Sequence, residues 1–344
     1  ERPRKVIFLF SPQGGQSIGM GAALYKTVPT FRDAVDQCQA LLVSWGSTEM
    51  LPFVQGAPDI TQGDANLEAG HTALFTLEYS LARMWTAWGV QPDVVLGQSL
   101  GEYPALVCSG VLSLEDGLRL VWQRARLILQ RCALNSSAML VIMADIRSIE
   151  DMAREYDGLS IVGYNGDYSA SVGGDIEQIK LLEDVCQQKG WWHRTIAAPY
   201  AYHTSAMEPI LDGLLDLGKA VTISCPTIPV VSTIHGLVVE AGDPSVFSDE
   251  YFAHHARRPI LLRDSISALA ARDAELVSEG VWLEIGPHTL VLPQLQLNAA
   301  VSKDCLQVSS LRRGEVDGEV ICQTLAHLHC AGVDIRWQDV YKEL

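Results

Sequence analysis

The sequence predicts an α/β fold with a largely parallel sheet, and three features of the chain carry this prediction. Short apolar runs alternate with longer segments whose apolar residues recur at helical spacing, an order typical of parallel sheets. The stretch from 138 to 197 instead reads strand, helix, strand, strand, helix, strand, which indicates a ferredoxin-like unit. With 344 residues and 48% hydrophobic content, the chain can build one large domain or two smaller ones.

The elements of the first third of the chain follow from apolar patterning. Residues 6–10 form an apolar run too short for a signal-peptide core or a membrane span, so we expect a buried strand. Residues 67–89 carry apolar side chains at every third or fourth position and predict a helix. A second short strand is expected at 94–96. An amphipathic helix is expected at 114–130, with Ser113 as its N-cap.

The middle of the chain is predicted to fold as a small inserted subdomain at 135–198, within a core made of 1–134 and 199–308. We expect its strands at 138–144, 159–162, 170–172 and 193–197, and its helices at 148–156 and 175–188. Beyond it, we expect a helix at 207–217 and buried strands at 230–233 and 282–285.

Charge and cysteine content restrict the classes of partner. The net charge of −16 argues against nucleic acid, so an anionic ligand would need a local arginine or lysine. The eight cysteines are scattered without a CxxC pair, which is typical of a reducing compartment, and we expect a cytoplasmic protein. No stretch is long and apolar enough to span a bilayer, so no membrane partner is expected.

Ser99 lies in Gly97-Gln98-Ser99-Leu100-Gly101, between an apolar run and helix-forming residues. A strand, Gly-x-Ser-x-Gly and helix in this order predict a nucleophile elbow, in which the serine Oγ projects from a sharp turn. The backbone N–H of Leu100 can then face a developing oxyanion. The simpler alternative is a serine in a tight turn without chemistry, because short motifs recur by chance.

A serine nucleophile needs a base, and the chain has nine histidines. His203 lies where the chain returns from the small subdomain to the core, and a junction of this kind is a usual place for an active site. Spacing alone gives it only a modest lead over His255 and His288. His327 and His329 form a weak metal pattern that is more typical of a helix surface, so no metal site is expected.

Six ordered segments give the chain a family resemblance: FLFSPQGGQSIGMG, GQSLGEYPALVCSGVLSLEDGLRLVWQRARLI, YAYHTSAM, RRPILLRDSI, WLEIGPH and SLRRGEVD. The chain resembles malonyl-CoA:acyl carrier protein transacylases, and in particular the acyltransferase domain of type I iterative polyketide synthases, most like the fungal non-reducing class. The resemblance implies an α/β-hydrolase-like large subdomain with a ferredoxin-like insertion. Residues 309–344 resemble the linker that follows this domain in multidomain synthases.

The resemblance also implies a role for each matching residue. Ser99 is the expected nucleophile and His203 the general base, then general acid. The backbone N–H groups of Gln13 and Leu100 are the expected oxyanion hole. Arg124 matches the arginine that grips the malonyl carboxylate, although on an amphipathic helix it would otherwise be read as an ordinary surface residue.

Four further pocket or positioning residues follow from the same resemblance. His255 falls where relatives carry Gln or Asn, whose backbone or side chain orients the catalytic histidine. Gln98 stands where most relatives have His, and its amide can still form hydrogen bonds. His71 stands where many have Gln. Tyr202 lies in a zone linked to the choice of acyl group, and its bulk suits malonyl better than a branched unit.

The implied reaction moves malonyl from malonyl-CoA, through a seryl ester, to the phosphopantetheine thiol of an acyl carrier protein. No metal or redox cofactor is expected. The expected partners are CoA thioesters, the carrier protein, and the ketosynthase and other domains of the same chain. The alternatives are a starter-unit transacylase that loads acetyl or a longer acyl group, a thioesterase-like hydrolase, and a non-catalytic docking domain. Arg124 argues against the starter-unit alternative, since a buried cation facing an alkyl chain would be unpaired.

Overall fold

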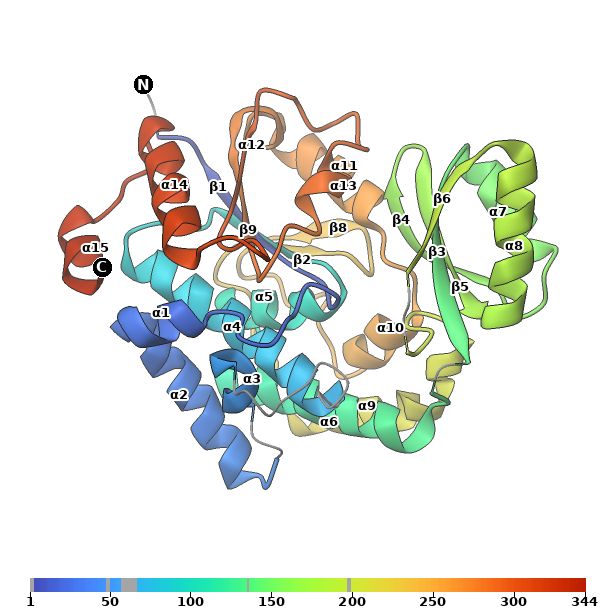
Figure 1. Cartoon of the computed structure of the whole chain (residues 1–344), viewed down its shortest axis with the longest axis horizontal. Helices are drawn as coiled ribbons and strands as arrows, with labels where there is room; N and C mark the ends of the chain where they lie inside the picture. Colours follow the sequence, from blue (N-terminus) through green and yellow to red (C-terminus); the bar gives the residue numbers. More distant parts are fainter. Residues whose placement is uncertain (1–2, 48–49, 57–66, 135, 197–198) are drawn as a thin grey trace.

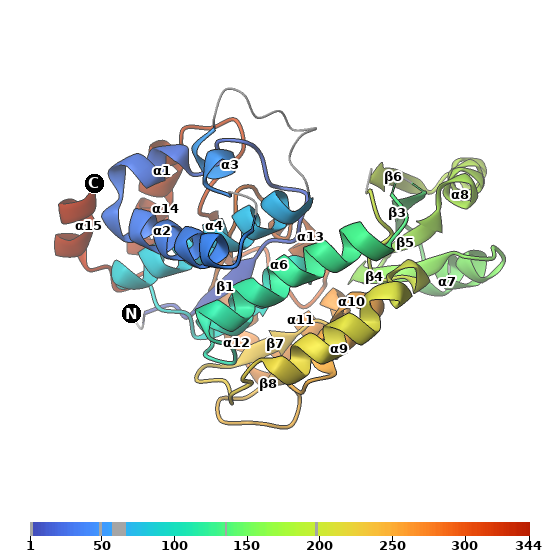
Figure 2. The same cartoon turned by 90° about the horizontal axis from the view of Figure 1, so that it is seen from below.

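The computed structural model describes residues 3–47, 50–56, 67–134, 136–196 and 199–344. These residues form a six-stranded sheet with helices on both faces and, at one end of the molecule, a four-stranded sheet (Figures 1 and 2). The strand order of the large sheet is β10-β9-β1-β2-β7-β8. Its strands are β1 (Val6–Phe10), β2 (Val94–Gly97), β7 (Val230–Ser232), β8 (Leu237–Val239), β9 (Val281–Ile285) and β10 (Leu306–Ser309).

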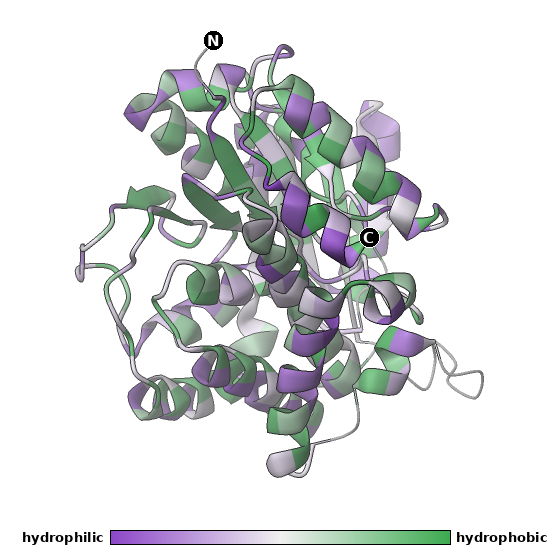
Figure 3. Ribbon diagram, turned by 90° about the vertical axis from the view of Figure 1, so that its left-hand side faces the viewer, coloured by the Kyte–Doolittle hydropathy of each residue, from purple (hydrophilic) through white to green (hydrophobic). Residues whose placement is uncertain are grey.

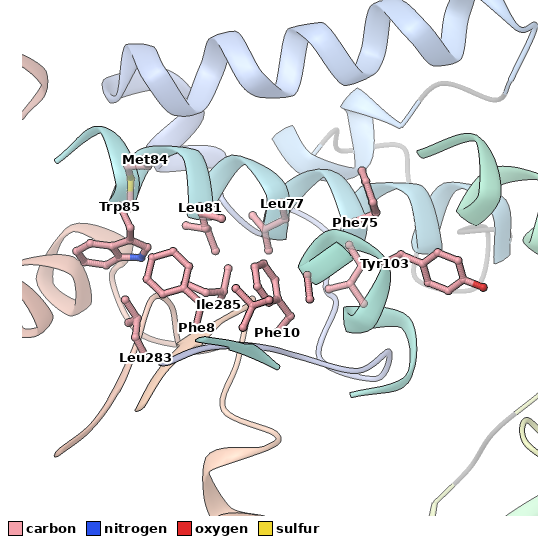
Figure 4. Packing of buried hydrophobic residues seen from close by; sticks show 14 of the residues in the cluster. Phe8, Phe10, Phe75, Leu77, Leu81, Met84, Trp85, Tyr103, Leu283 and Ile285 are labelled. Atoms are coloured by element: carbon pink, nitrogen blue, oxygen red, sulfur yellow. The ribbon is translucent and has the colours of Figure 1, made fainter. Parts of the chain in front are cut away.

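All neighbouring strands of the large sheet are parallel except β7 and β8, which form an antiparallel pair. Strands β1 and β2 at the centre are continuous apolar runs, as expected where helices cover both faces of a sheet. Figure 3 shows them as hydrophobic ribbons among helices of mixed character. On one face, Phe8 and Phe10 pack under Leu77, Leu81 and Trp85 of the long helix α4 (Leu67–Ala87), as Figure 4 shows.

The predicted helices 67–89 and 114–130 are present as α4 and α6 (Leu114–Arg131), and α6 begins at the predicted cap. The Ser113 hydroxyl accepts a hydrogen bond from the N–H of Asp116 at 3.0 Å. The other helices around the large sheet are α1 (Ala22–Thr27), α2 (Pro29–Ser44), α3 (Leu51–Gln55), α5 (Glu102–Cys108), α9 (Leu211–Ala220), α10 (Tyr251–Arg257), α11 (Leu262–Arg272), α12 (Ala274–Glu279), α13 (Leu292–Leu295), α14 (Asp317–Cys330) and α15 (Trp337–Glu343).

The small sheet has the predicted order of elements and is antiparallel throughout. Its strand order is β4-β5-β3-β6, the arrangement of a ferredoxin-like unit, so this prediction is confirmed. The predicted boundaries at 135 and 198, and residue 197 of the last strand, lie outside the described residues. The elements are β3 (Ser137–Met143), α7 (Ile146–Arg154), β4 (Ser160–Gly166), β5 (Ser169–Asp175), α8 (Ile176–Lys189) and β6 (Trp192–Ile196).

The segment 309–344 starts at the last residue of β10 and packs on the large sheet. Thr324 donates a hydrogen bond to the carbonyl of Ser309 at 2.7 Å, and the Trp88 indole donates to Glu343 at 2.9 Å. The residues predicted as a linker therefore complete the core of this domain. In the part of the chain described, no helix is long and apolar enough to cross a bilayer.

Candidate active site

Ser99 occupies a strained turn between β2 and α5, where a short 3₁₀ segment (Ser99–Gly101) joins strand to helix. Its φ is +52°, and that of His203 is +63°. They are the two non-glycine residues with positive φ in the described ranges. A left-handed backbone costs energy for any residue with a Cβ, so both positions are held there by their surroundings.

Two glycines make this turn possible. A Cβ on Gly97 would lie 2.2 Å from the carbonyl oxygen of Gly101. A Cβ on Gly101 would lie 2.5 Å from the carbonyl oxygens of Phe10 and Ser11. The missing side chains let α5 start directly against the end of β1, which projects the serine as a nucleophile elbow requires.

The structure brings Ser99 and His203 together. The Ser99 Oγ lies 2.9 Å from the His203 Nε2, and both side chains are buried. The other ring nitrogen, Nδ1, lies 3.0 Å from the carbonyl of Arg258. Because a carbonyl only accepts, Nδ1 carries the hydrogen and Nε2 presents its lone pair to the serine hydroxyl. Burial, and then the charge of Arg124, lower the pKa of His203 to about 4, so the ring is neutral and can act as a base.

Main-chain groups at the end of α10 orient His203, and of the two alternatives given for His255, its backbone or its side chain, the backbone is the one that contacts His203. The hydrogen-bonding carbonyl belongs to Arg258, just past the end of α10, and the N–H of His203 donates to the carbonyl of Ala256 at 3.2 Å. The last carbonyls of a helix have no partner within it, so they are available here. The backbone hydrogen bond of His255 partly opposes the lowering of the His203 pKa, whereas the side chain of His255 contacts Ser99.

Arg124 projects from α6 and is fully buried, not on the surface. None of its three guanidinium nitrogens has a hydrogen-bond partner among the residues that the structure describes. Its guanidinium carbon lies 5.5 Å from the centre of the Tyr202 ring, and after burial its charge is the next cause that lowers the pKa of His71 and His203. An unpaired buried cation is costly, so this position is suited to an anionic ligand.

The three other pocket candidates lie around this cation and the elbow. Tyr202 is buried, with its ring centre 6.2 Å from that of His71. Burial, followed by the charge of Arg124, lowers the pKa of His71 to about 3. The Gln98 amide pairs with the amide of Gln294 through two hydrogen bonds of 3.0 and 3.1 Å, so it supports the turn rather than the Ser99 hydroxyl.

The loop of Gln13 follows β1 and lies beside the elbow. The N–H of Gln98 donates to the carbonyl of Phe10 at 3.1 Å, which ties the two segments together. The carbonyls of Gly14 and Gly15 accept hydrogen bonds of 3.2 and 2.7 Å from Arg313. The loop that carries Gln13 is thus tied to the elbow at one end and to Arg313 at the other.

Three residues that support the site were not predicted. Glu102 is buried behind the elbow and accepts hydrogen bonds from Tyr251 and from Thr233, the latter at 2.7 Å; burial raises its pKa to about 7. The position of Glu102 directly after the Gly-x-Ser-x-Gly motif was a feature of the sequence that could have identified it. Glu284 accepts from Ser11 at 2.9 Å and stands out as a charge within an apolar strand. Arg258 acts through its main chain, which leaves no signal in the sequence.

Within the described part of the chain, no group of three or more His, Cys, Asp or Glu side chains is arranged to hold a metal ion. His327 and His329 are exposed on α14.

Comparisons with known proteins show the family to which the chain belongs. Residues 7–335 match the family described as acyl transferase domain, so the chain belongs to that family. It is 38% identical to orsellinic acid synthase ArmB of Armillaria ostoyae over 99% of this chain and 16% of that protein. It is 34% identical to an orsellinic acid synthase of Emericella nidulans and 32% to the non-reducing polyketide synthase stmB of Aspergillus ustus. The chain thus spans about a sixth of the length of these relatives.

Solved structures give the same result. The acyltransferase domain from the second module of the salinomycin polyketide synthase superposes with a TM-score of 0.88 at 28% identity, over 99% of this chain and 76% of that one. The acyl transferase domain of SpnD, in complex with 2-(pent-4-yn-1-yl)malonyl, gives 0.85 at 29% identity, over 97% and 78%. The predicted family is confirmed: this is an acyltransferase domain of the polyketide synthase type.

Proposed function

We propose that this domain transfers a malonyl group from malonyl-CoA, through an ester on Ser99, to the phosphopantetheine thiol of an acyl carrier protein. The unpartnered guanidinium of Arg124, close enough to lower the pKa of His203, carries the proposal. A malonyl carboxylate must leave water to enter a buried site, and a planar guanidinium can replace its hydration with two parallel hydrogen bonds. An acetyl group has no such charge and would leave the cation unpaired.

In the first half-reaction, His203 takes the proton of the Ser99 hydroxyl as the oxygen attacks the thioester carbonyl. The N–H groups of Leu100 and Gln13 stabilise the negative oxygen of the tetrahedral intermediate. When the carbon–sulfur bond breaks, the imidazolium returns its proton to the CoA sulfur. Malonyl-Ser99 and free CoA are the products.

The second half-reaction uses the same groups in the same order. His203 removes the proton from the carrier thiol, whose sulfur attacks the seryl ester. As the ester bond breaks, the proton passes to the Ser99 oxygen and restores the free enzyme. The scheme needs no metal or redox cofactor.

We infer the partners of this domain from the greater length of its relatives and from its own net charge. Its relatives are multidomain synthases, so we propose that the carrier protein, the ketosynthase and other domains belong to the same chain. With a net charge of −16, the domain attracts an anionic thioester through local cations rather than its overall field. All eight cysteines are free thiols, which supports a cytoplasmic, reducing location.

The test compares the rate of acyl-enzyme formation from malonyl-CoA and acetyl-CoA by rapid quenching and intact mass. Arg124→Ala should lower kcat/KM for malonyl by about 100-fold, since roughly 3 kcal/mol of charged pairing is lost. Acetyl loading should hold steady or rise, because the unpaired cation is gone. Arg124→Lys should rescue malonyl only in part, since lysine offers a point charge.

Two controls complete this experiment. Ser99→Ala should carry no acyl group from either thioester. Arg126→Ala removes a cation two residues along α6, whose guanidinium lies over the Trp122 ring, and should leave the ratio of the two rates unchanged. Equal losses for malonyl and acetyl in Arg124→Ala would mean that Arg124 supports the fold or binds CoA. Wild type that loads acetyl as fast as malonyl would instead indicate a starter-unit transacylase.

A further inference from the structure

We propose that His255 is a positioning residue that orients the peptide group between Ser99 and Leu100, so that its N–H faces the oxyanion. This inference rests on the proposed function, because it concerns the stabilisation of the acyl-transfer intermediate. It gives His255 a role other than contact with the catalytic histidine. It also gives a reason for a buried polar imidazole at a position that an apolar side chain could fill.

The contact itself is direct. The Nε2 of His255 lies 3.0 Å from the carbonyl oxygen of Ser99, and the side chain is 1% exposed. Because the carbonyl can only accept, Nε2 carries the hydrogen and donates it. The His255 ring packs edge-on against Tyr103 at 5.1 Å and against His203 at 6.0 Å, so its position is fixed on two sides.

The carbonyl of Ser99 and the N–H of Leu100 belong to one peptide group. That group is planar, with its C=O and N–H pointing in opposite directions, so an anchor on the carbonyl fixes the direction of the N–H. The carbonyl also accepts from the N–H of Glu102, and His255 uses its second lone pair. A hydrogen bond to the carbonyl also polarises the N–H and makes it a stronger donor.

The strain of the turn makes such an anchor necessary. Ser99 has a φ of +52°, a conformation that persists only where the surrounding structure imposes it. His255 supplies a contact from α10, which lies far from the elbow in the sequence. The carboxylate of Glu102, 3.7 Å from the same Nε2 and tied to Thr233 at 2.7 Å, limits where the imidazole can move.

The charge state of His255 suits this role. Burial, and then the neighbouring His203, lower the pKa of His255 well below its ordinary value, so the imidazole stays neutral. A neutral donor holds the peptide without placing a second positive charge beside His203, which becomes an imidazolium during the reaction. Glutamine can supply the same neutral N–H donor over a similar reach, whereas leucine fills the space without donating.

The experiment measures the carbonyl stretch of the malonyl-Ser99 ester by infrared spectroscopy, with the ester carbonyl labelled with carbon-13. In His255→Leu, we expect the band to move to higher frequency, because the Leu100 N–H is a weaker and less well directed donor. Loading should slow by roughly 10- to 100-fold, less than the loss of a whole oxyanion donor. In His255→Gln, both the band and the rate should return close to wild type. His254→Leu, which changes the neighbouring histidine on α10, is the matched control.

The outcomes separate this inference from the proposed function. If wild type forms no malonyl ester, the proposed function is wrong and no band appears. If wild type shows the band and a folded His255→Leu leaves it unmoved, the positioning role is wrong. If the leucine variant does not fold, the comparison of His255→Gln with His255→Asn decides, because asparagine is too short to reach the carbonyl. Equal bands and rates for these two amides would overturn the inference.

Discussion

His203 can act as a base at neutral pH because burial and the nearby cation of Arg124 both oppose its protonation. Its pKa is lowered to about 4, whereas an ordinary histidine is half protonated near pH 6.5. The protonated ring has no lone pair to accept the serine proton, so activity belongs to the neutral form above the pKa. The acid limb of the pH profile therefore reports on this environment.

We expect the inactivation of Ser99 by a serine-directed phosphonate to be constant from about pH 8 to about pH 5 and to fall near pH 4. In Arg124→Ala the limb should move to higher pH, since one of the two causes of the lowered pKa is removed. The phosphonate carries no malonyl group, so the assay works in both proteins. An acid limb near pH 6.5 in wild type would mean that burial and Arg124 do not lower the pKa of His203.

Among the residues of the site, the sequence singled out Ser99, His203 and Arg124 because each lies in one of the segments that carry the family resemblance. Ser99 and His203 meet at hydrogen-bonding distance, and Arg124 is buried as a carboxylate partner would need. The main-chain carbonyl of Arg258 was missed because any amino acid can supply it. The contact of His255 with Ser99 depends on how α10 packs behind the elbow, which no local pattern encodes.

The elbow is the element on which the site depends, and its glycines are required by contact with backbone atoms. Gly101→Ala would place a methyl group 2.5 Å from the carbonyls of Phe10 and Ser11. We expect the free energy of unfolding to fall by about 2–3 kcal/mol, with loss of phosphonate labelling, because the backbone cannot yield as a side chain can.

Chemical denaturation of Gly101→Ala and of a matched glycine variant checks this expectation. Gly318 lies in the first turn of α14, is exposed, and has open space where a Cβ would be. Gly318→Ala should leave stability unchanged or raise it by up to about 1 kcal/mol. Similar stability changes in the two variants would show that contact at the elbow is not the cause.

The elements that the sequence predicted best are those buried on both sides. The strands at 6–10 and 94–96 are continuous apolar runs, the strand at 282–285 is apolar except for Glu284, and the structure has strands at all three places. The edge strands β8 and β10 were not predicted, because they are short and only partly buried. Helix α2 was also missed, although its buried residues recur at helical spacing: Phe31, Val35, Cys38 and Leu42.

Across the whole molecule, the C-terminal segment reaches the site through one arginine. Arg313 donates to the carbonyls of Gly14 and Gly15, next to Gln13, from a stretch expected to be a linker. Among the described residues, the side chain of its neighbour Arg312 forms a hydrogen bond with Ser309 and an ion pair with Glu315, both in its own segment. Comparing variants of Arg313 and Arg312 therefore separates an effect on the loop at residues 13–15 from a general effect of charge.

Arg313→Ala should slow acyl-enzyme formation by about 10-fold, since small displacements of catalytic groups are costly, with little change in Tm. Arg312→Ala should leave the rate within about twofold. Stopped-flow loading and thermal unfolding of both variants test this. Equal rates in the two variants would show that the loop at residues 13–15 keeps its conformation without Arg313.

The hydrogen bonds of His203 join three parts of the chain that lie far apart in sequence: the elbow at Ser99, the junction at His203 itself, and the end of α10 at Arg258. Glu284 of β9, a still later part, fixes the end of β1 beside the elbow. During synthesis on the ribosome, Ser99 therefore emerges long before the groups that activate it. Closing loops of this length also costs chain entropy, which slows the formation of contacts between residues so far apart in sequence. Under the function proposed above, the growing chain therefore carries an unreactive serine, and the site is complete only when the chain as far as β9 has folded.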